Sequence, residues 1–369
     1  MSYPTGLQYF QMKFSTFPIS GEVYLTGYFV ALALSFGLTF YLIKAIRGFN
    51  FLTFLLNRLP ISAGNSISPF GGLSVILSFL ITLWLLLFSG LVDARNLNLI
   101  CVLTLGLGMM LILGIYDDIT NCPPRVKLLV QIAIACTLYF AGFQIDRIGN
   151  LVDLGPFSIL LTVLWIVGIT NAINLIDGMD GLAPGIIFFS CLTLGFVFLE
   201  RNIVEASFLA VILAGSILGF FFFNLPPAKI ILGDTGSLPL GLLVSLITLL
   251  PLNQGHTDEI YYLIPVITLL IPIMDTTFAF FRRILKGISP FTKDANHFHH
   301  RLEKLGLSPS KAISILFAIG FYFDLTALIP VYRIHLIPNF IPIYFVFTIA
   351  SVAILIYILH RIEKKQNND

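Results

Sequence analysis

The stretch SVILSFLITLWLLLFSGL, residues 74–91, has no charged side chain and is long enough to cross a lipid bilayer as a helix. Similar apolar runs recur along the chain of 369 residues, of which 57% are hydrophobic and only 11% charged. A soluble domain carries roughly 25% charged residues, so this composition excludes a water-soluble globular protein. The runs also lack the alternating pattern of an outer-membrane barrel. We therefore expect an all-α, polytopic integral membrane protein.

The apolar runs between polar breaks predict about 11 transmembrane helices, because each crossing needs about 20 apolar residues. The fifth and eighth of these spans are short for a bilayer, and Pro265 and Pro272 are expected to kink the ninth. No loop is long enough to fold alone, so residues 1–369 are predicted to form a single membrane-embedded domain. The expected spans are 24–43, 71–91, 98–115, 127–144, 157–171, 182–199, 206–223, 237–252, 260–281, 312–330 and 339–359.

Lysine and arginine residues divide unequally between the two sides of this predicted topology. Sixteen of the 21 fall after odd-numbered spans or in the C-terminal tail, and the other five are Lys13, Arg95, Arg147, Arg201 and Arg333. Cytoplasmic loops carry the excess of basic residues, so we expect the N-terminus outside and the C-terminus in the cytoplasm. The predicted cytoplasmic loops are about 44–70, 116–126, 171–181, 224–236 and 282–311.

Polar residues that serve no solubilising purpose gather at four places, all on the predicted cytoplasmic side. The first is the pair Asp117 and Asp118, at the end of the span 98–115. Adjacent carboxylates repel each other. A membrane boundary increases the free-energy cost of this repulsion unless a cation or a shared proton offsets it. The pair is therefore a candidate for divalent-metal binding or acid–base chemistry, with solvated carboxylates at a helix end as the alternative.

The second place is the stretch NAINLIDGMDG, in which amides and carboxylates recur at every third residue. On a regular helix such a set drifts around the surface, so its members converge only if the helix breaks or tightens. The two glycines of the stretch permit a break. The four candidate residues are Asn171, Asn174, Asp177 and Asp180.

The third place is GDTGS, residues 233–237, where Asp234 lies between glycines that let the backbone approach a phosphate or a metal ion closely. The sequence Gly-Asp-Thr-Gly is also typical of an ordinary turn. The fourth place combines three histidines with an arginine: His297, His299, His300 and Arg301. If this segment is helical, three of these four share a face that suits phosphate oxygens. Zinc ligation is the less favoured alternative, because no cysteine lies nearby.

Two classes of function fit these residues. An integral membrane enzyme acting on a phosphorylated substrate would hold Mg²⁺ with carboxylates and neutralise phosphate with basic side chains. A secondary transporter would need polar residues near the bilayer midplane and a repeat between its halves. Here the polar residues lie at span ends and no repeat is detected, which favours the enzyme. A P-loop motif is absent, which excludes ATP binding by such a loop.

Five ordered motifs resemble those of a known family: GIYDDITN with RVKLLVQ, LTVLWIVGITNAINLIDGMDGLA, FNLPPAKIILGDTGSLPLG, IPIMDTTFAFFRR and SPFTKDANHFHHRLEKLGLS, spanning residues 114–308. They are similar to the polyprenyl-phosphate N-acetylhexosamine-1-phosphate transferases, glycosyltransferase family 4. The HxHHRL element resembles the branch that starts O-antigen, enterobacterial common antigen or teichoic acid synthesis more than the peptidoglycan branch. The resemblance implies transfer of N-acetylhexosamine 1-phosphate, with GlcNAc-1-phosphate the expected group, from a UDP-sugar to undecaprenyl phosphate with release of UMP.

The resemblance also implies roles for individual residues. The implied catalytic residues are Asp117, Asp118 and Asp234, and the implied ligands of Mg²⁺, with Mn²⁺ as an alternative, are Asn174 and Asp234. The implied substrate-binding residues are Asp177, Asp180, Asn171, His297, His299, His300, Arg301 and Lys127. The chain departs from many relatives at residues 66–70, Ser-Ile-Ser-Pro-Phe, because no basic residue precedes the Gly-Gly pair there.

The same resemblance implies a multi-pass protein of the bacterial inner membrane with its active site on the cytoplasmic side. The expected partners are a UDP-N-acetylhexosamine, undecaprenyl phosphate and the lipid bilayer, and no nucleic acid. The identity of the sugar, the final polymer and the choice between single and double displacement stay open, with the peptidoglycan precursor as an alternative donor. The oligomeric state is also open, with a homodimer as one option.

Overall fold

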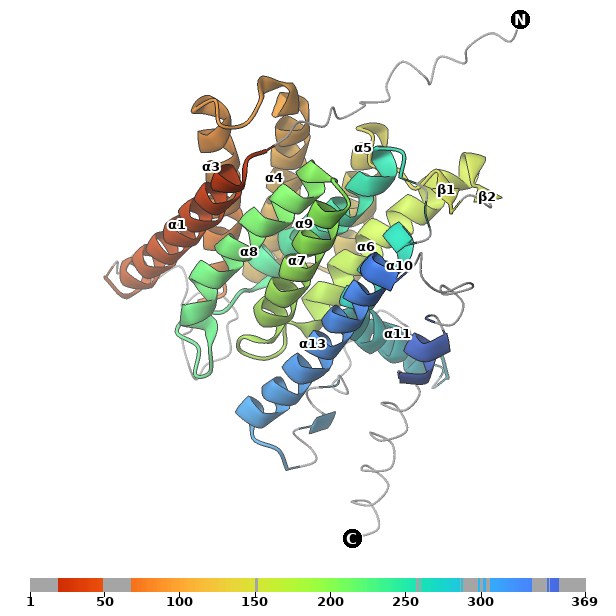
Figure 1. Cartoon of the computed structure of the whole chain (residues 1–369). Coiled ribbons are helices and arrows are strands. Elements are labelled where there is room, and N and C mark those ends of the chain that lie inside the picture. Colours follow the sequence, from red (N-terminus) through yellow and green to blue (C-terminus); the bar gives the residue numbers. More distant parts are fainter. Residues whose placement is uncertain are drawn as a thin grey trace, which may run out of the picture.

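The fold is a bundle of long helices (Figure 1), seen in a computed structural model that describes residues 19–48, 68–149, 152–256, 258, 260–285, 287, 298, 301–302, 306–333, 344 and 346–351. In this part of the chain the only strands are β1 (Arg147–Ile148) and β2 (Val152–Asp153), which pair antiparallel between two helices. The helices are α1 (Gly21–Gly48), α3 (Gly71–Phe88), α4 (Leu97–Thr120), α5 (Pro124–Phe140), α6 (Ser158–Ile176), α7 (Leu182–Glu200), α8 (Val204–Asn224), α9 (Asp234–Asn253), α10 (Ile260–Thr268), α11 (Leu270–Leu285) and α13 (Pro309–Arg333).

The all-α, polytopic character predicted from the sequence is confirmed. Among the described residues, 8 helices are long and apolar enough to cross a membrane, or up to 9 if α10 and α11 form one bent span. The helix α5, with 17 residues, is shorter than these eight. Most of the predicted span 339–359 lies outside the described residues. The count of eleven and the sides on which the termini lie therefore stay predictions.

The predicted kink in the ninth span is a break of 75° between α10 and α11. Pro272 has no backbone N–H, so it cannot donate a helical hydrogen bond to the carbonyl of Thr268. That carbonyl instead accepts a hydrogen bond of 2.9 Å from Ser190 Oγ on α7. The proline thus ends the regular helix, and a neighbouring helix satisfies the carbonyl group that it leaves unpaired.

Two spans that the sequence predicted to be short are longer in the structure. The helix α6 has 19 residues and continues through Asn171 and Asn174, while α9 has 20 residues and begins at Asp234. Polar side chains usually end an apolar span, but here Asn174 Nδ2 donates to Asp234 Oδ1 at 2.6 Å. The two polar helix ends satisfy each other, so neither helix needs to stop where its apolar run stops.

The helix α9 forms the centre of the bundle (Figure 1) and packs against α3, α4, α6 and α8. Every residue from Thr235 to Pro251 is buried, as expected for a helix that is apolar on all sides. By contrast, α1 lies at the edge, packs against α3 and α8, and exposes Leu25, Phe29 and Phe40 on its other face. A multi-pass membrane protein would present such a face to lipid.

Glycines let α3 approach the start of α9 at backbone contact distance. A Cβ atom on Gly72 would collide with the Cα atom of Gly236, and a Cβ on Gly236 would collide with Gly72. The backbone N–H groups of Gly71 and Gly72 also donate to the carbonyls of Ile231 and Leu232, both at 3.0 Å. The segment before α9 is therefore fixed to the beginning of α3 through main-chain contacts.

We predict that Gly72→Ala destabilises the protein by about 1–3 kcal/mol, because the added methyl group has to displace backbone rather than a flexible side chain. Gly108→Ala is the matched control, since a Cβ atom on that α4 glycine would meet nothing within 4 Å. The thermal unfolding midpoint of the protein in detergent measures both. Equal midpoints for the two variants would contradict the assigned contact.

Candidate active site

Four helix ends meet at one end of the bundle. They are the C-terminal ends of α4 and α6 and the N-terminal ends of α5 and α9. The helix α4 ends where Asn121 adopts a left-handed conformation, with φ 50°, and α5 begins three residues later at Pro124. The helix break that the glycines of the stretch 171–181 permit is present too, since α6 ends at Ile176 and Gly181 has a positive φ of 78°.

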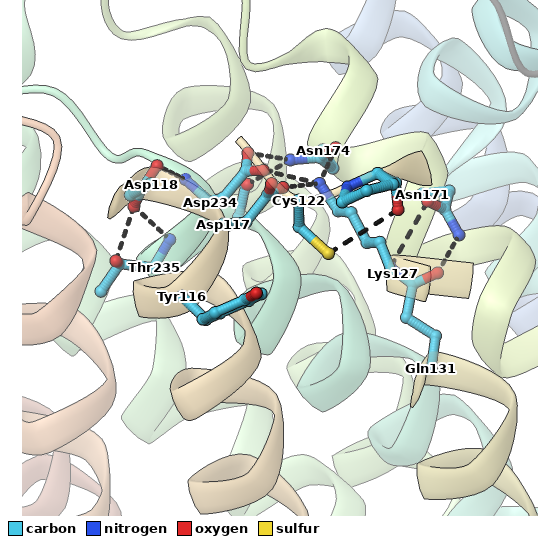
Figure 2. A network of polar contacts seen from close by, with 12 residues as sticks. Tyr116, Asp117, Asp118, Cys122, Lys127, Gln131, Asn171, Asn174, Asp234 and Thr235 are labelled. Carbon is cyan, nitrogen blue, oxygen red and sulfur yellow. Dashed lines mark hydrogen bonds and ion pairs between the residues drawn. The ribbon is translucent and has the colours of Figure 1, made fainter. Parts of the chain in front are cut away.

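The ammonium group of Lys127 lies at the meeting point of these ends (Figure 2). It donates to Asp117 Oδ2 at 2.7 Å, to Asp234 Oδ2 at 2.6 Å and to Asn174 Oδ1 at 3.3 Å. The four side chains come from four different helices and are largely shielded from solvent, with 14% of the Lys127 side chain exposed. We call Lys127, Asp117, Asn174 and Asp234 the Lys127 cluster.

Asn174 links the cluster to the first turn of α9. Its Nδ2 donates to Asp234 Oδ1 at 2.6 Å and to Ser237 Oγ at 2.8 Å. The two oxygens of Asp234 therefore face different partners, the amide of Asn174 and the ammonium of Lys127. This arrangement fixes the Asp234 carboxylate in one orientation, while the amide oxygen of Asn174 accepts from the Lys127 ammonium.

Asp118 has a different role from its neighbour Asp117, because adjacent helical residues point about 100° apart. Its carboxylate accepts from the backbone N–H of Asp234 at 3.0 Å, and from the N–H and Oγ1 of Thr235 at 2.8 and 2.6 Å. An α4 side chain thus caps the N-terminus of α9, where the helix dipole favours negative charge. Gly233, with φ 70°, makes the turn into α9, and a Cβ there would collide with the carbonyl of Pro69.

Asn171 pairs with Gln131, one helical turn away from the cluster. Asn171 Nδ2 donates to Gln131 Oε1 and to the carbonyl of Val167, both at 2.8 Å, and Gln131 Nε2 donates back at 3.4 Å. Gln131 is fully buried and was not among the predicted site residues. Its position four residues after Lys127, as a polar residue in an apolar helix, is the sequence signal that could have found it.

Asp177 and Asp180 lie in the turn between α6 and α7. Desolvation, together with the negative charges of Asp234, Asp118 and Asp180, raises the pKa of Asp177 well above its ordinary value. Asp180 Oδ2 accepts from the backbone N–H of Ala228 at 3.0 Å, which ties this turn to the loop before α9. Asp177 therefore lies near Asp234 of the Lys127 cluster, whereas Asp180 contacts the loop before α9.

Asn224, at the end of α8, is a further residue of this region that was not predicted from the sequence. It is buried, accepts from the backbone N–H of Gly181 at 2.8 Å and donates to the carbonyl of Ile230 at 2.9 Å. A single amide thus holds together the two loops that carry Asp180 and Asp234. Its neighbours in sequence are apolar or proline, which gave no signal of this role.

The histidine segment is described only in part. His297, His299 and His300 lie outside the described residues, so their approach to the Lys127 cluster stays a prediction. Arg301 is partly buried and is followed by the buried Leu302. The backbone N–H of Phe298 donates to Asp275 Oδ1 at 2.9 Å, which anchors this part of the segment to α11.

The oxygen-rich cluster suits a hard divalent cation. Carboxylate and amide oxygens are the ligands that Mg²⁺ prefers, and Asp234 Oδ2 and Asn174 Oδ1 both face the Lys127 ammonium. Within the described ranges, no group of three His, Cys, Asp or Glu side chains is placed to hold a metal ion alone. Mg²⁺ typically binds through one or two carboxylates and takes its remaining ligands from phosphates and water, so the residues fit such an ion.

A known protein family matches the part of the sequence that contains the candidate site. The sequence profile described as "Glycosyl transferase family 4" matches residues 99–251. This range contains the whole Lys127 cluster, together with Asp118, Asp177 and Asp180. The histidine segment lies beyond it.

Curated relatives match over a similar length. The Bacillus subtilis protein named "Probable undecaprenyl-phosphate N-acetylglucosaminyl 1-phosphate transferase" is 41% identical over 232 residues, which are 62% of this chain and 64% of that protein. "Decaprenyl-phosphate N-acetylglucosaminephosphotransferase" of Mycolicibacterium smegmatis is 33% identical over 57% of this chain and 58% of its own length. "Phospho-N-acetylmuramoyl-pentapeptide-transferase" of Thermotoga maritima is 30% identical over 61% and 75%. The chain thus spans less than two thirds of the first two relatives.

We predict that Asp118→Ala lowers the free energy of unfolding by about 2 kcal/mol, because the first turn of α9 loses its cap. Asp117→Ala is expected to cost less, since it removes one partner of Lys127 but also relieves repulsion from Asp234. Thermal unfolding in detergent, without substrate, compares the two variants. A larger loss for Asp117→Ala would contradict the distinction between the two aspartates.

Proposed function

The chain belongs to glycosyltransferase family 4, and on this premise we propose that it transfers N-acetylhexosamine 1-phosphate, most of all GlcNAc-1-phosphate, from the UDP-sugar to undecaprenyl phosphate. The products would be UMP and a lipid-linked sugar diphosphate that starts a cell-envelope glycopolymer. The observation that carries the proposal is the Lys127 cluster, which places an ammonium among carboxylate and amide oxygens that accept its hydrogen bonds, at one end of a bundle of long apolar helices. Phosphoryl transfer at a membrane surface needs this combination of groups.

In the proposed reaction, an oxygen of the lipid phosphate attacks the phosphorus that carries the sugar, and the bond from that phosphorus to the bridging oxygen breaks. UMP leaves with the bridging oxygen. A phosphate monoester has its second pKa near about 6, so the acceptor is already largely dianionic near neutral pH. A general base is therefore not required, and we assign Asp117 to orienting the Lys127 ammonium rather than to removing a proton.

We propose that Asp234 and Asn174 hold Mg²⁺, with Mn²⁺ as an alternative. Asp234 Oδ2 and Asn174 Oδ1 both accept from the Lys127 ammonium, at 2.6 and 3.3 Å, and carboxylate and amide oxygens are ligands that suit this ion. When bound, the cation would offset the charge that builds up between the donor diphosphate and the dianionic acceptor. Asp118 supports the same site indirectly, by fixing the backbone of Asp234 and Thr235.

The remaining predicted residues are assigned to the substrates. Lys127 would donate to a phosphate oxygen, and Asp177 and Asp180 would accept hydrogen bonds from the nucleotide or the sugar. The hydrogen bond from the backbone N–H of Ala228 would hold the Asp180 carboxylate in place for this role. The histidine segment with Arg301 would contact phosphate or sugar, in keeping with its basic side chains.

We place the protein in the inner membrane of a bacterium, with this site on the cytoplasmic side. Arg125, Lys127 and Lys229 lie in segments at the same end of the bundle as the site, whereas Arg147 lies in the hairpin between the opposite ends of α5 and α6. Loops rich in lysine and arginine face the cytoplasm. UDP-sugars and the phosphate head of the lipid would meet at this surface.

A second candidate donor is the peptidoglycan precursor. The Thermotoga relative named for that reaction is matched over 75% of its length, more than the Bacillus relative at 64%. We favour GlcNAc-1-phosphate, because identity to the Bacillus relative is higher, at 41% against 30%. A transporter is not favoured, since the polar residues lie at helix ends rather than at the bilayer midplane.

The test is to supply the purified full chain with undecaprenyl phosphate, Mg²⁺ and one donor at a time: UDP-GlcNAc, UDP-GalNAc or the UDP-linked muramoyl pentapeptide. UMP release and the mass of the lipid product are measured. The proposal predicts UMP and a GlcNAc diphosphate lipid from UDP-GlcNAc. A product from the pentapeptide nucleotide alone would establish the second candidate, and no product from any donor would contradict the proposal.

We predict that Asp234→Asn lowers kcat at least about 100-fold, which corresponds to about 2.7 kcal/mol of transition-state stabilisation. The substitution removes the charge that would hold the cation and keeps the size of the side chain. Asp258→Asn, at an exposed position just after α9, is the matched control and should keep full activity. Full activity of a folded Asp234→Asn protein would remove the metal assignment.

A further inference from the structure

The ammonium group of Lys127 has no hydrogen-bond donor to spare in this structure. An ammonium has three N–H donors, and here the three acceptors are Asp117, Asp234 and Asn174 at 2.7, 2.6 and 3.3 Å. Lys127 can therefore donate to a substrate phosphate only after it gives up at least one of these acceptors.

Two of those acceptors are the oxygens that a divalent cation would need. Mg²⁺ binds oxygen ligands at about 2.0–2.1 Å, so an ion held by Asp234 and Asn174 would take the lone pairs that now point to Lys127. Two cations at such separation also repel each other strongly in a site shielded from water. The ammonium and the divalent cation are thus competitors for Asp234 and Asn174.

We propose that Lys127 is a tethered counter-ion, which a divalent cation displaces from Asp234 and Asn174 and which then binds a phosphate oxygen of the substrate. This inference rests on the proposed function for the identity of that phosphate. Asp117 acts as the pivot, because it is the one partner of the ammonium that the cation does not need. The contact to Asp117 at 2.7 Å can persist while the other two are exchanged.

The surroundings confine this exchange to the lysine side chain. Lys127 is in the first turn of α5, and its four-carbon stem can rotate without movement of the helix. One turn further along, the Gln131–Asn171 pair fixes α5 against α6. The cap that Asp118 provides fixes the start of α9 in the same way. Only the ammonium has to move, over a short distance, from carboxylate to phosphate.

The exchange reverses the sign of the cluster's charge. Lys127 alone, facing Asp117 and Asp234, leaves the cluster net negative, which disfavours the approach of a phosphate. Adding a divalent cation makes it net positive and frees an N–H donor at the same time. By thermodynamic linkage, the cation must then increase phosphate affinity and phosphate must increase cation affinity.

The first experiment measures Mn²⁺ binding to the full-length protein in detergent, without nucleotide or lipid, from the electron paramagnetic resonance signal of free Mn²⁺. Lys127→Gln removes the competitor and is expected to tighten Mn²⁺ binding about 10- to 100-fold, the usual range of such coupling. Lys229→Gln removes the same charge from an exposed position and should change the affinity less than about twofold. Unchanged or weaker binding by Lys127→Gln would overturn the proposal.

A second readout separates displacement from simple repulsion. Acylation of the Lys127 amine, followed by mass spectrometry at fixed pH, reports whether the ammonium has left its carboxylate partners, with the Lys229 peptide as internal standard. Displacement predicts that Mn²⁺ speeds acylation several-fold and that inorganic phosphate, added together with Mn²⁺, slows it again. An acylation rate that Mn²⁺ does not change would show that Lys127 stays in place, and would overturn the exchange.

Asp234→Asn distinguishes this inference from the proposed function. If wild-type protein binds Mn²⁺ and Asp234→Asn does not, the cation site stands, and the Lys127→Gln affinity together with the acylation rate decides the exchange. If neither the wild-type protein nor Lys127→Gln binds Mn²⁺, the cation assignment fails and the exchange fails with it.

Discussion

The candidate site depends most on one interaction, the contact of the Lys127 ammonium with Asp117, Asp234 and Asn174. These residues come from α5, α4, α9 and α6, so a single charged group joins four helix ends that are distant in sequence. In a shielded site the two carboxylates would repel each other strongly without it. The attraction that brings the helix ends together therefore also creates the oxygen cluster on which the proposed chemistry relies.

The helix α9 connects the Lys127 cluster to the rest of the bundle. Its buried body packs against α3, α4, α6 and α8, while its first turn carries Asp234 and is capped by Asp118. The contact of Gly72 with Gly236 fixes the same turn against α3. The position of the candidate metal ligand is thus set by core packing and main-chain contacts rather than by a loose loop, as a preorganised site requires.

Much of this arrangement could be predicted from the sequence, because membrane-spanning helices make uncompensated polar residues conspicuous. The apolar runs indicated the helical bundle, and Pro265 and Pro272 indicated the broken span. The polar residues at the ends of α4, α6 and α9 indicated one common site. The confirmed family resemblance agrees with that site, since the matched segment contains all of these residues.

Other features could not be predicted, because they depend on which way a side chain points in three dimensions. Asp117 and Asp118 are identical neighbours in sequence, yet one contacts a lysine and the other caps a helix. Asn171 fits the three-residue repeat, but its amide pairs with Gln131, which the repeat does not contain. The extra length of α6 and α9 also follows from hydrogen bonds between the two helices, which no single span reveals.

The most direct test of the central claim is a double-mutant cycle between Lys127→Met and Asp234→Asn, measured by thermal unfolding of the protein in detergent without substrate. If the ammonium joins the helix ends, the double variant should be more stable than the sum of the single effects predicts, with a coupling of at least about 1 kcal/mol. Effects that add to within about 0.5 kcal/mol would show that the two residues do not interact, and would contradict the account.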